Sequence, residues 1–225
     1  MDSANLFASF FERNLQKDQI IISPAIEIKF FSRPKILKKT TNLIFTSSNG
    51  VKAAGQAVND NIRAICVGDR TTSLASSLGY SAEKYGDNVE QLIKKLCLSK
   101  KIEGDILHIR GKYTKVDLMN RLRKAGFLCH EWEGYDQIAK NLSFQALNAF
   151  KNGEKIILPI FSERSGRLLK DQIPNFDKCH IIAISSAVAN VFLDVSPASI
   201  SEAHTPDLVG MRSSTKTVLE NAHLE

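Results

Sequence analysis

The chain lacks the sequence features that mark several common classes of protein. None of its apolar runs approaches the length of a membrane span. The first residues, MDSANLFASFFERNL, carry an acidic residue at position 2 and no cleavage-type site, so they do not read as a signal peptide. The patterns GxGxxG, GxSxG and HExxH and the P-loop are absent. We therefore expect a soluble globular protein that lacks these common catalytic signatures.

Cysteine and histidine are also scarce. None of the four cysteines lies in a close pair: Cys66, Cys97, Cys129 and Cys179. This spacing favours buried, reduced thiols in a cytoplasmic protein over a disulfide framework or a zinc site. The five histidines have no metal-ligand spacing. We interpret His108, inside an apolar run, as a satisfied core histidine and keep His130 as a weak site candidate.

Positive charge is in modest excess: the chain has 30 Lys and Arg and 24 Asp and Glu, which gives a net charge of +6. The densest basic group is Arg33, Lys35, Lys38 and Lys39. No aromatic platform accompanies it, so a solvated face is favoured over nucleic-acid binding. A positive balance also suits a small polyanionic ligand.

A strand–helix–strand–helix pattern occurs twice. Residues 42–80 begin NLIFTSSNGV and continue through AICVGDRTTS, and residues 155–195 begin KIILPIFSERSG and continue through HIIAISSAVA. Each apolar run ends in a turn of small or hydroxyl side chains. The repetition predicts an α/β fold of two similar lobes with parallel sheets, of the flavodoxin or Rossmann type, around a common cleft.

The other segments are assigned from periodicity and turn residues. We expect helices over 4–15, 88–100, 113–126 and about 208–219, and strands over 20–23, 26–31, 106–110 and 127–132. The run over 127–132 should end at Glu133-Gly134-Tyr135, and a domain boundary should fall near 31–33.

Ligand sites in parallel sheets lie beyond the carboxyl ends of the strands. The turns expected there contribute backbone amides and hydroxyls that suit carboxylates. For any single turn, helix capping alone explains the Ser and Thr residues, but five turns converging from two lobes indicate a binding site. The candidate residues are Thr46, Ser47, Ser48, Asn49, Gly68, Thr71, Arg110, Gly111, Lys112, Ser162, Arg164, Ser165, Ser185 and Ser186.

Several of these segments resemble the uroporphyrinogen-III synthase family in order and spacing. They are LIFTSSNGV, AICVGDRTTSLASSLGY, GDNVEQLIKKL and ILHIRG…LMNRLRKAGF…EWEGYDQ, with IFSERSG and HIIAISSAVANVF matching more loosely. The resemblance covers residues from about 4 to 195. It implies one lobe from 1–28 with 138–225, a second from 33–128, and linker strands at 29–32 and 129–137.

The resemblance also implies a reaction. The linear tetrapyrrole hydroxymethylbilane would be cyclised to uroporphyrinogen III, with loss of water, inversion of the last pyrrole ring and no cofactor. Tyr135 matches the tyrosine of the family's second linker strand, which is the candidate proton donor to the departing hydroxyl group. Without the resemblance, Tyr135 would be interpreted as a packed aromatic residue with a hydrogen-bonded hydroxyl group. The partner would be this small molecule, and the protein would act as a monomer.

Two departures from the family pattern stand out. The strand that normally precedes the first helix is not seen, and Ser185 and Val188 stand where the family has Gly and Thr. A non-catalytic, two-lobed protein that binds small polyanions is therefore an alternative. A flavodoxin-like module and a periplasmic receptor are less favoured, because the phosphate loop or acidic pocket of the one and the export signal of the other are not seen.

Overall fold

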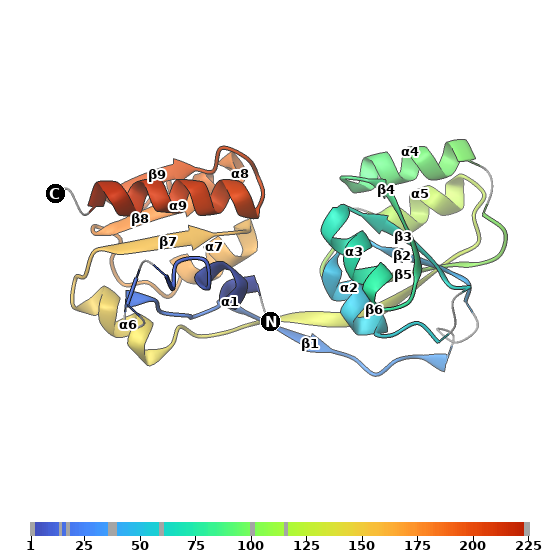
Figure 1. Cartoon of the computed structure of the whole chain (residues 1–225), viewed down its shortest axis with the longest axis horizontal. Coiled ribbons are helices and arrows are strands. Elements are labelled where there is room, and N and C mark those ends of the chain that lie inside the picture. The colour runs from blue at the N-terminus through green and yellow to red at the C-terminus, as the bar shows by residue number, and fades with distance from the viewer. Residues whose placement is uncertain are drawn as a thin grey trace. The chain divides into compact units, whose positions relative to one another are not determined.

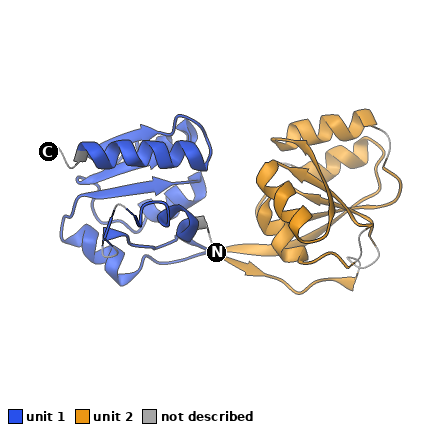
Figure 2. Ribbon diagram, viewed as in Figure 1, with its two compact units in different colours: residues 1–27, 139–225 blue, residues 28–138 orange. Residues whose placement is uncertain are grey.

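Alternating strands and helices build two units in this computed structural model, which describes residues 3–13, 15–16, 19–35, 40–58, 61–99, 102–114 and 117–222 (Figure 1). Unit 1 consists of Met1–Glu27 and Ala139–Glu225, and unit 2 of Ile28–Ile138 (Figure 2). The chain therefore passes between the units twice, within strands β1 (Ile26–Phe30) and β6 (Cys129–Ala139).

The sheet of unit 2 has the order β1-β6-β5-β2-β3-β4 among the described residues. Its other strands are β2 (Asn42–Phe45), β3 (Arg63–Val67), β4 (Ser81–Gly86) and β5 (Ile106–Gly111). Strand β2 pairs in parallel with β3 and β5, and β5 pairs in parallel with β6. Strand β1 runs antiparallel to β6, because Phe31 N–H donates to Gly134 O (2.9 Å) and Lys140 N–H donates to Ala25 O (2.8 Å).

Helices cover both faces of this sheet. Alternate strand residues such as Leu43 and Leu107 pack under α2 (Ser48–Ala54) and α3 (Asp69–Ser77). Their neighbours Ile44 and Ile106 pack under α4 (Val89–Ser99) and α5 (Leu118–Lys124). The near-continuous apolar runs of β2, β3 and β5 are what a sheet buried on both faces requires.

Unit 1 has a smaller sheet, which runs β7-β8-β9 within the described residues. Strands β7 (Ile156–Ile160), β8 (Cys179–Ala183) and β9 (Ser199–Glu202) are all parallel. One face packs against α6 (Phe144–Lys151), α7 (Glu163–Lys170), α8 (Ser186–Ala189) and η3 (Asn190–Phe192). The other packs against α1 (Ser3–Ala8) and α9 (Leu208–Ala222).

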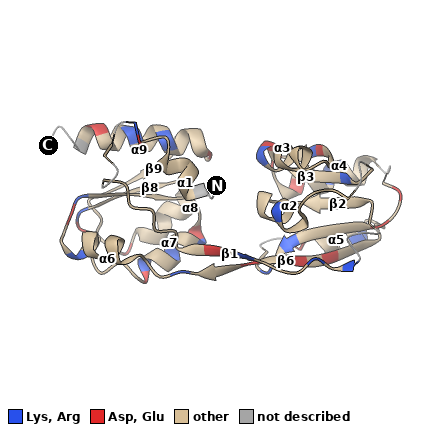
Figure 3. Ribbon diagram, turned by 60° about the horizontal axis from the view of Figure 1, so that its bottom comes forward, with Lys and Arg blue, Asp and Glu red and all other residues tan. Residues whose placement is uncertain are grey.

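The predicted α/β class with parallel sheets is confirmed, and each repeat forms a parallel β-α-β unit, β2-α2-β3 and β7-α7-β8. The assignment of 29–32 and 129–137 as linker strands stays a prediction. In the basic group, Lys38 and Lys39 lie outside the described residues. Lys and Arg are scattered over both units among Asp and Glu (Figure 3). No helix in the described part of the chain is long and apolar enough to cross a membrane.

Two predictions near the N-terminus are wrong. The helix expected over 4–15 ends at Ala8, where the Ser9 hydroxyl donates to the Leu6 carbonyl (3.0 Å) and competes with helical bonding. The strand expected over 20–23 is not formed. Ile20 and Ile21 do pack against the clusters on opposite faces of the β7-β8-β9 sheet. The side chains therefore alternate between two faces as they do in a strand, but the backbone of residues 20–23 forms no ladder of hydrogen bonds with a neighbouring strand.

Two boundaries in unit 2 also differ from those expected. Helix α5 begins at Leu118, not at 113, because Asp117 Oδ1 caps it by accepting from Asn120 N–H (3.2 Å). Strand β6 continues through Gly134 to Ala139 instead of ending at 133–135. Gly134 is accommodated as an extra residue in the strand.

The amides of β7 should exchange with solvent faster than those of β2. Strand β7 lies at the edge of its sheet with β8 as its neighbour, whereas β2 lies between β3 and β5. Opening β7 therefore breaks fewer ladder bonds. Hydrogen exchange read by mass spectrometry on peptides from 155–161 and 42–46 would check this, with the edge strand β4 as a control. Equal protection of β7 and β2 would contradict it.

Candidate functional site

The turn after β2 is a short polar segment at the carboxyl end of a fully buried strand. Ser47 has an extended backbone and caps α2, since its hydroxyl oxygen accepts from Gly50 N–H (3.3 Å). Ser48 and Asn49 open the helix and are half-buried. The predicted turn is therefore formed as expected, with its first hydroxyl group engaged as a cap.

Tyr135 is directed toward this turn by an irregularity in β6. In the β5–β6 register Arg110 pairs with Glu133 but Gly111 pairs with Tyr135, so Gly134 is an extra residue. Such a bulge reverses which face the following side chains take. Trp132 and Tyr135 consequently pack against the same apolar cluster, although an uninterrupted strand would place them on opposite faces. A Cβ on Gly134 would lie 2.8 Å from Ala53 Cβ, so the bulge has room only for glycine.

The Tyr135 hydroxyl lies 3.0 Å from Ser47 Oγ, and either group can be the donor. The tyrosine is 7% exposed and its ring lies over Gly111, where a Cβ would come within 2.8 Å of Cε2. The Tyr135 carbonyl accepts from Lys112 N–H (2.9 Å). Three segments distant in sequence, the β2 turn, the end of β5 and the β6 bulge, thus converge on one hydroxyl group.

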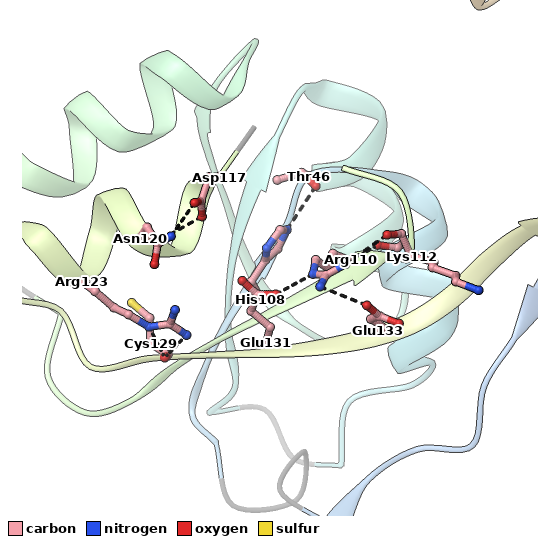
Figure 4. Close-up of polar contacts among 11 residues, drawn as sticks. Thr46, His108, Arg110, Lys112, Asp117, Asn120, Arg123, Cys129, Glu131 and Glu133 are labelled. Carbon is pink, nitrogen blue, oxygen red and sulfur yellow. Dashed lines mark hydrogen bonds and ion pairs between the residues drawn. The ribbon is translucent and has the colours of Figure 1, made fainter. Parts of the chain in front are cut away.

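The side chains on the other face of the same strands form a second polar group, shown in Figure 4. His108 is 3% exposed, and its Nε2 lies 3.3 Å from Thr46 Oγ1. This confirms the interpretation of His108 as a satisfied core histidine. Burial lowers the pKa of His108 from 6.5 to about 4, so its ring is neutral at pH 7.

The cations expected to bind carboxylates already face protein carboxylates. Arg110 contacts Glu131 (Nε–Oε2, 2.6 Å) and Glu133 (3.0 Å), and its Nη1 donates to the carbonyls of Gly111 and Lys112. Lys112 Nζ lies 3.7 Å from Asp136 Oδ2. A substrate carboxylate would therefore have to compete with these groups. Sequence reasoning missed these acidic residues on β6, because their place beside Arg110 depends on the β5–β6 register; the local signal was only the alternation of Glu131 and Glu133.

A cavity of about 320 Å³ adjoins this group. It is lined by His108, Arg110, Glu131, Thr114, Asp117, Leu118 and Met119. Among the described residues, no group of three or more His, Cys, Asp or Glu side chains could hold a metal ion.

The remaining candidates of unit 2 lie at the end of β3. Gly68 precedes α3 with φ 77°, and Thr71 is buried in the first turn of that helix. Asp69 at the same turn pairs with Lys84 (2.8 Å). His130 lies elsewhere: it pairs with Leu107 in the register, near the amino end of β5, and contacts Asp105 (3.3 Å).

The candidates of unit 1 form two helix starts. Ser162 caps α7 by accepting from Ser165 N–H (3.1 Å), and the two hydroxyl groups are 2.8 Å apart. Arg164 lies in the first turn of α7. Ser185 and Ser186 begin α8, where the Ser185 carbonyl accepts from Val188 N–H (3.0 Å). The structure thus brings Ser47, Gly111 and Tyr135 together on one face of the unit 2 sheet. It places Thr46 beside His108 on the other face, and it holds the Ser162 and Ser185 turns in unit 1.

Acid should destabilise unit 2 through His108. Its folded-state pKa of about 4 lies below the ordinary 6.5, so the unfolded chain takes up the proton first as pH falls. The stabilising contribution is complete above about pH 6.5 and is lost as pH falls toward 4, amounting to about 2 kcal/mol by pH 5. Urea unfolding followed by the fluorescence of Trp132, the single tryptophan, should show this loss in the wild type. His108→Leu should lack it; an equal loss in both proteins would contradict the assignment.

The fold and site define a class: a protein of two parallel α/β units with hydroxyl- and amide-bearing turns at the strand ends and a buried tyrosine beside one of them. The family model of uroporphyrinogen-III synthase HemD matches residues 17–211. The chain belongs to the uroporphyrinogen-III synthase family, the cyclising hydro-lyases of haem biosynthesis.

Solved structures agree with this fold. The uroporphyrinogen-III synthetase of Helicobacter pylori superposes with a TM-score of 0.67 at 17% identity, covering 86% of this chain and 91% of that one. A mutant uroporphyrinogen III synthase of the extremely thermophilic bacterium Thermus thermophilus gives a TM-score of 0.56 at 12% identity, covering 97% and 95%. A search of curated proteins finds no match. The comparisons support the synthase, not the non-catalytic polyanion-binding alternative.

Proposed function

We propose that this chain converts hydroxymethylbilane to uroporphyrinogen III and that the Tyr135 site of unit 2 takes part directly. Hydroxide leaves the hydroxymethyl carbon with a proton, as water, and a delocalised cation remains. The substituted carbon of the terminal pyrrole attacks this cation to form a spiro intermediate. The older bond of the spiro carbon, to the methylene bridge of the neighbouring ring, then breaks and leaves a second cation on that methylene. The unsubstituted α-carbon of the terminal pyrrole bonds to this methylene, which closes the macrocycle with the terminal ring inverted, and a final proton loss restores the aromatic pyrrole. The balance is one water released, with no oxidant or cofactor.

Tyr135 is the proposed proton donor to the departing hydroxyl group. A phenol keeps its proton at neutral pH and can donate it or a hydrogen bond. The observation that carries this role is the convergence of the β2 turn, Gly111 and the β6 bulge on the Tyr135 hydroxyl, with Ser47 Oγ 3.0 Å away. The Ser47 hydroxyl can donate a hydrogen bond to the phenol oxygen or accept one from it, so the pair can adjust as the leaving group departs.

Substrate carboxylates are the proposed ligands of the polar turns. The substrate carries eight, and holding so flexible a chain in a geometry that allows spiro closure is a large part of the work of the enzyme. The contacts proposed in unit 2 are Thr46, Ser47, Ser48, Asn49, Gly68, Thr71, Arg110, Gly111 and Lys112, and those in unit 1 are Ser162, Arg164, Ser165, Ser185 and Ser186. Arg110 and Lys112 would exchange part of their contacts with Glu131, Glu133 and Asp136 for substrate carboxylates.

The architecture proposed for the full reaction has β1 and β6 as a two-stranded linker, because the chain changes unit within both strands. We further propose a monomeric cytoplasmic enzyme whose partner is a linear tetrapyrrole, with neither nucleic acid nor membrane as a ligand. Its modest positive charge of +6 favours association with a polycarboxylate.

The deciding experiment is incubation of the full chain with hydroxymethylbilane, followed by oxidation and separation of the product isomers. Closure without ring inversion gives the type I isomer, and closure through the spiro intermediate gives type III. We expect type III to dominate in proportion to enzyme concentration. A product that is type I alone, at the rate found without protein, would contradict the proposal.

A further inference from the structure

Two neighbouring residues of the β2 turn are held from opposite faces of the unit 2 sheet. Thr46 Oγ1 contacts His108 Nε2 (3.3 Å) on the face covered by α4 and α5. Ser47 Oγ contacts the Tyr135 hydroxyl (3.0 Å) on the face covered by α2 and α3. A displacement of Thr46 must therefore move Ser47, because a single peptide unit joins them.

The position of His108 suits it to hold this turn. In the parallel register His108 pairs with Ile44, two residues before Thr46, so the imidazole lies on the same face as the threonine side chain. Figure 4 shows the ring directed at the Thr46 hydroxyl. A neutral imidazole has one donor and one acceptor nitrogen, and a hydroxyl group can serve either, so the bond forms in both tautomers.

The charged groups around His108 leave the ring in its neutral state. Arg110 follows two residues later on β5, and Glu131 pairs with His108 across the β5–β6 register. Arg110 and Glu131 bind each other at 2.6 Å, so their charges largely offset at the imidazole. Asp117, across the cavity, is engaged in capping α5. Buried polar groups of this kind are costly unless bonded, which makes the Thr46 contact important for the ring.

We propose that His108 is a positioning residue, which fixes the turn through Thr46 and thereby sets the place of Ser47 and of the Tyr135 hydroxyl. This inference rests on the proposed function of Tyr135 and extends it to a residue on the opposite face of the sheet. His108 does not touch the reacting atoms, because the sheet separates its ring from the face on which Tyr135 lies.

The kinetic test compares His108→Leu, which fills the space without a hydrogen bond, with His108→Gln, whose amide can reach toward Thr46. Losing one such bond should lower kcat for hydroxymethylbilane about 5–10-fold with KM changed less than about twofold. His108→Gln should restore kcat to within about twofold of the wild type. The matched control is His130→Leu, since His130 in the neighbouring strand makes a contact of the same length, 3.3 Å, with Asp105. It should leave kcat unchanged.

Two double variants separate positioning from a general loss of stability. In the Tyr135→Phe background, His108→Leu should lower kcat by less than about twofold further, because the hydroxyl group it positions is gone. In the Thr46→Val background, His108→Leu should likewise lower kcat by little more than Thr46→Val alone. If the losses in kcat instead multiply in both double variants, the proposal is overturned.

A measurement that does not need activity completes the test. Hydrogen exchange at the Gly50 and Val51 amides, which bond to Ser47, should be about 5–10-fold faster in His108→Leu and unchanged in His130→Leu. Faster exchange with no type III product from the wild type would uphold the positioning role and reject the proposed function. Unchanged exchange would overturn the positioning role even if the wild type forms the type III isomer.

Discussion

Tyr135→Phe should slow the formation of uroporphyrinogen III by about 10²–10⁴-fold, the range usual for loss of a general acid. The ring and its packing are retained, and only the hydroxyl group beside Ser47 is removed. The rate should remain above that of the uncatalysed reaction, because holding the substrate chain supplies the rest of the acceleration. The isomer formed should still be type III, since ring inversion depends on how the chain is held. Single-turnover rates and isomer analysis would measure both effects.

Tyr80→Phe is the matched control for this variant. Tyr80 packs in the same apolar cluster, is 6% exposed, and donates its hydroxyl proton to the Gly55 carbonyl (2.8 Å). Both variants lose one buried hydrogen bond and should lose about 1 kcal/mol of unfolding free energy. Only Tyr135→Phe should lose activity. Unchanged turnover in Tyr135→Phe would reduce Tyr135 to a packed aromatic residue.

Gly111→Ala should cost about 10²-fold in kcat by displacing the tyrosine ring. An added Cβ would lie 2.8 Å from Tyr135 Cε2, 2.9 Å from Cζ and 3.1 Å from the hydroxyl oxygen. Real Cβ atoms essentially never approach other atoms as closely as the first two distances, so the ring or the end of β5 must move. Because the hydroxyl group itself is among the crowded atoms, a shift of the ring carries it away from Ser47.

The test of this variant again uses the Tyr135→Phe background. If Gly111→Ala acts by moving the hydroxyl group, it should add little to the loss already caused by Tyr135→Phe. Urea unfolding followed by Trp132 fluorescence should show a cost of about 1–3 kcal/mol, typical of overpacking. Wild-type kcat in Gly111→Ala, or a full second loss in the double variant, would show that the ring position does not govern the reaction.

Part of the site could be read from sequence because its signals are local. Ser47 and Ser162 stand where a strand gives way to a helix, and both do cap the helix that follows. The roles proposed for the turn residues stay predictions. The spacing of β2, α2 and β3 follows from side-chain periodicity within a few residues.

Other features depend on contacts between distant segments. Thr46 and His108 are 62 residues apart, and Ser47 and Tyr135 are 88 apart. The neutralisation of Arg110 by Glu131 and Glu133 requires β5 and β6 to be neighbours in register. Residues 20–23 have the side-chain alternation of a strand but do not pair with a neighbouring strand. Strand formation depends on the segments that pack beside a stretch of chain as well as on its own sequence.

The sequence by itself determined the α/β class, the repeated β-α-β units and the turns at the strand ends, since each follows from the local periodicity of apolar side chains and from turn residues. Only the tertiary structure decided which face Tyr135 takes. A single extra residue, Gly134, shifts the β5–β6 register and turns the phenol toward Ser47. The local sequence has a glycine at this position. Whether that glycine ends the strand or forms a bulge within it depends on the pairing with the neighbouring strand β5.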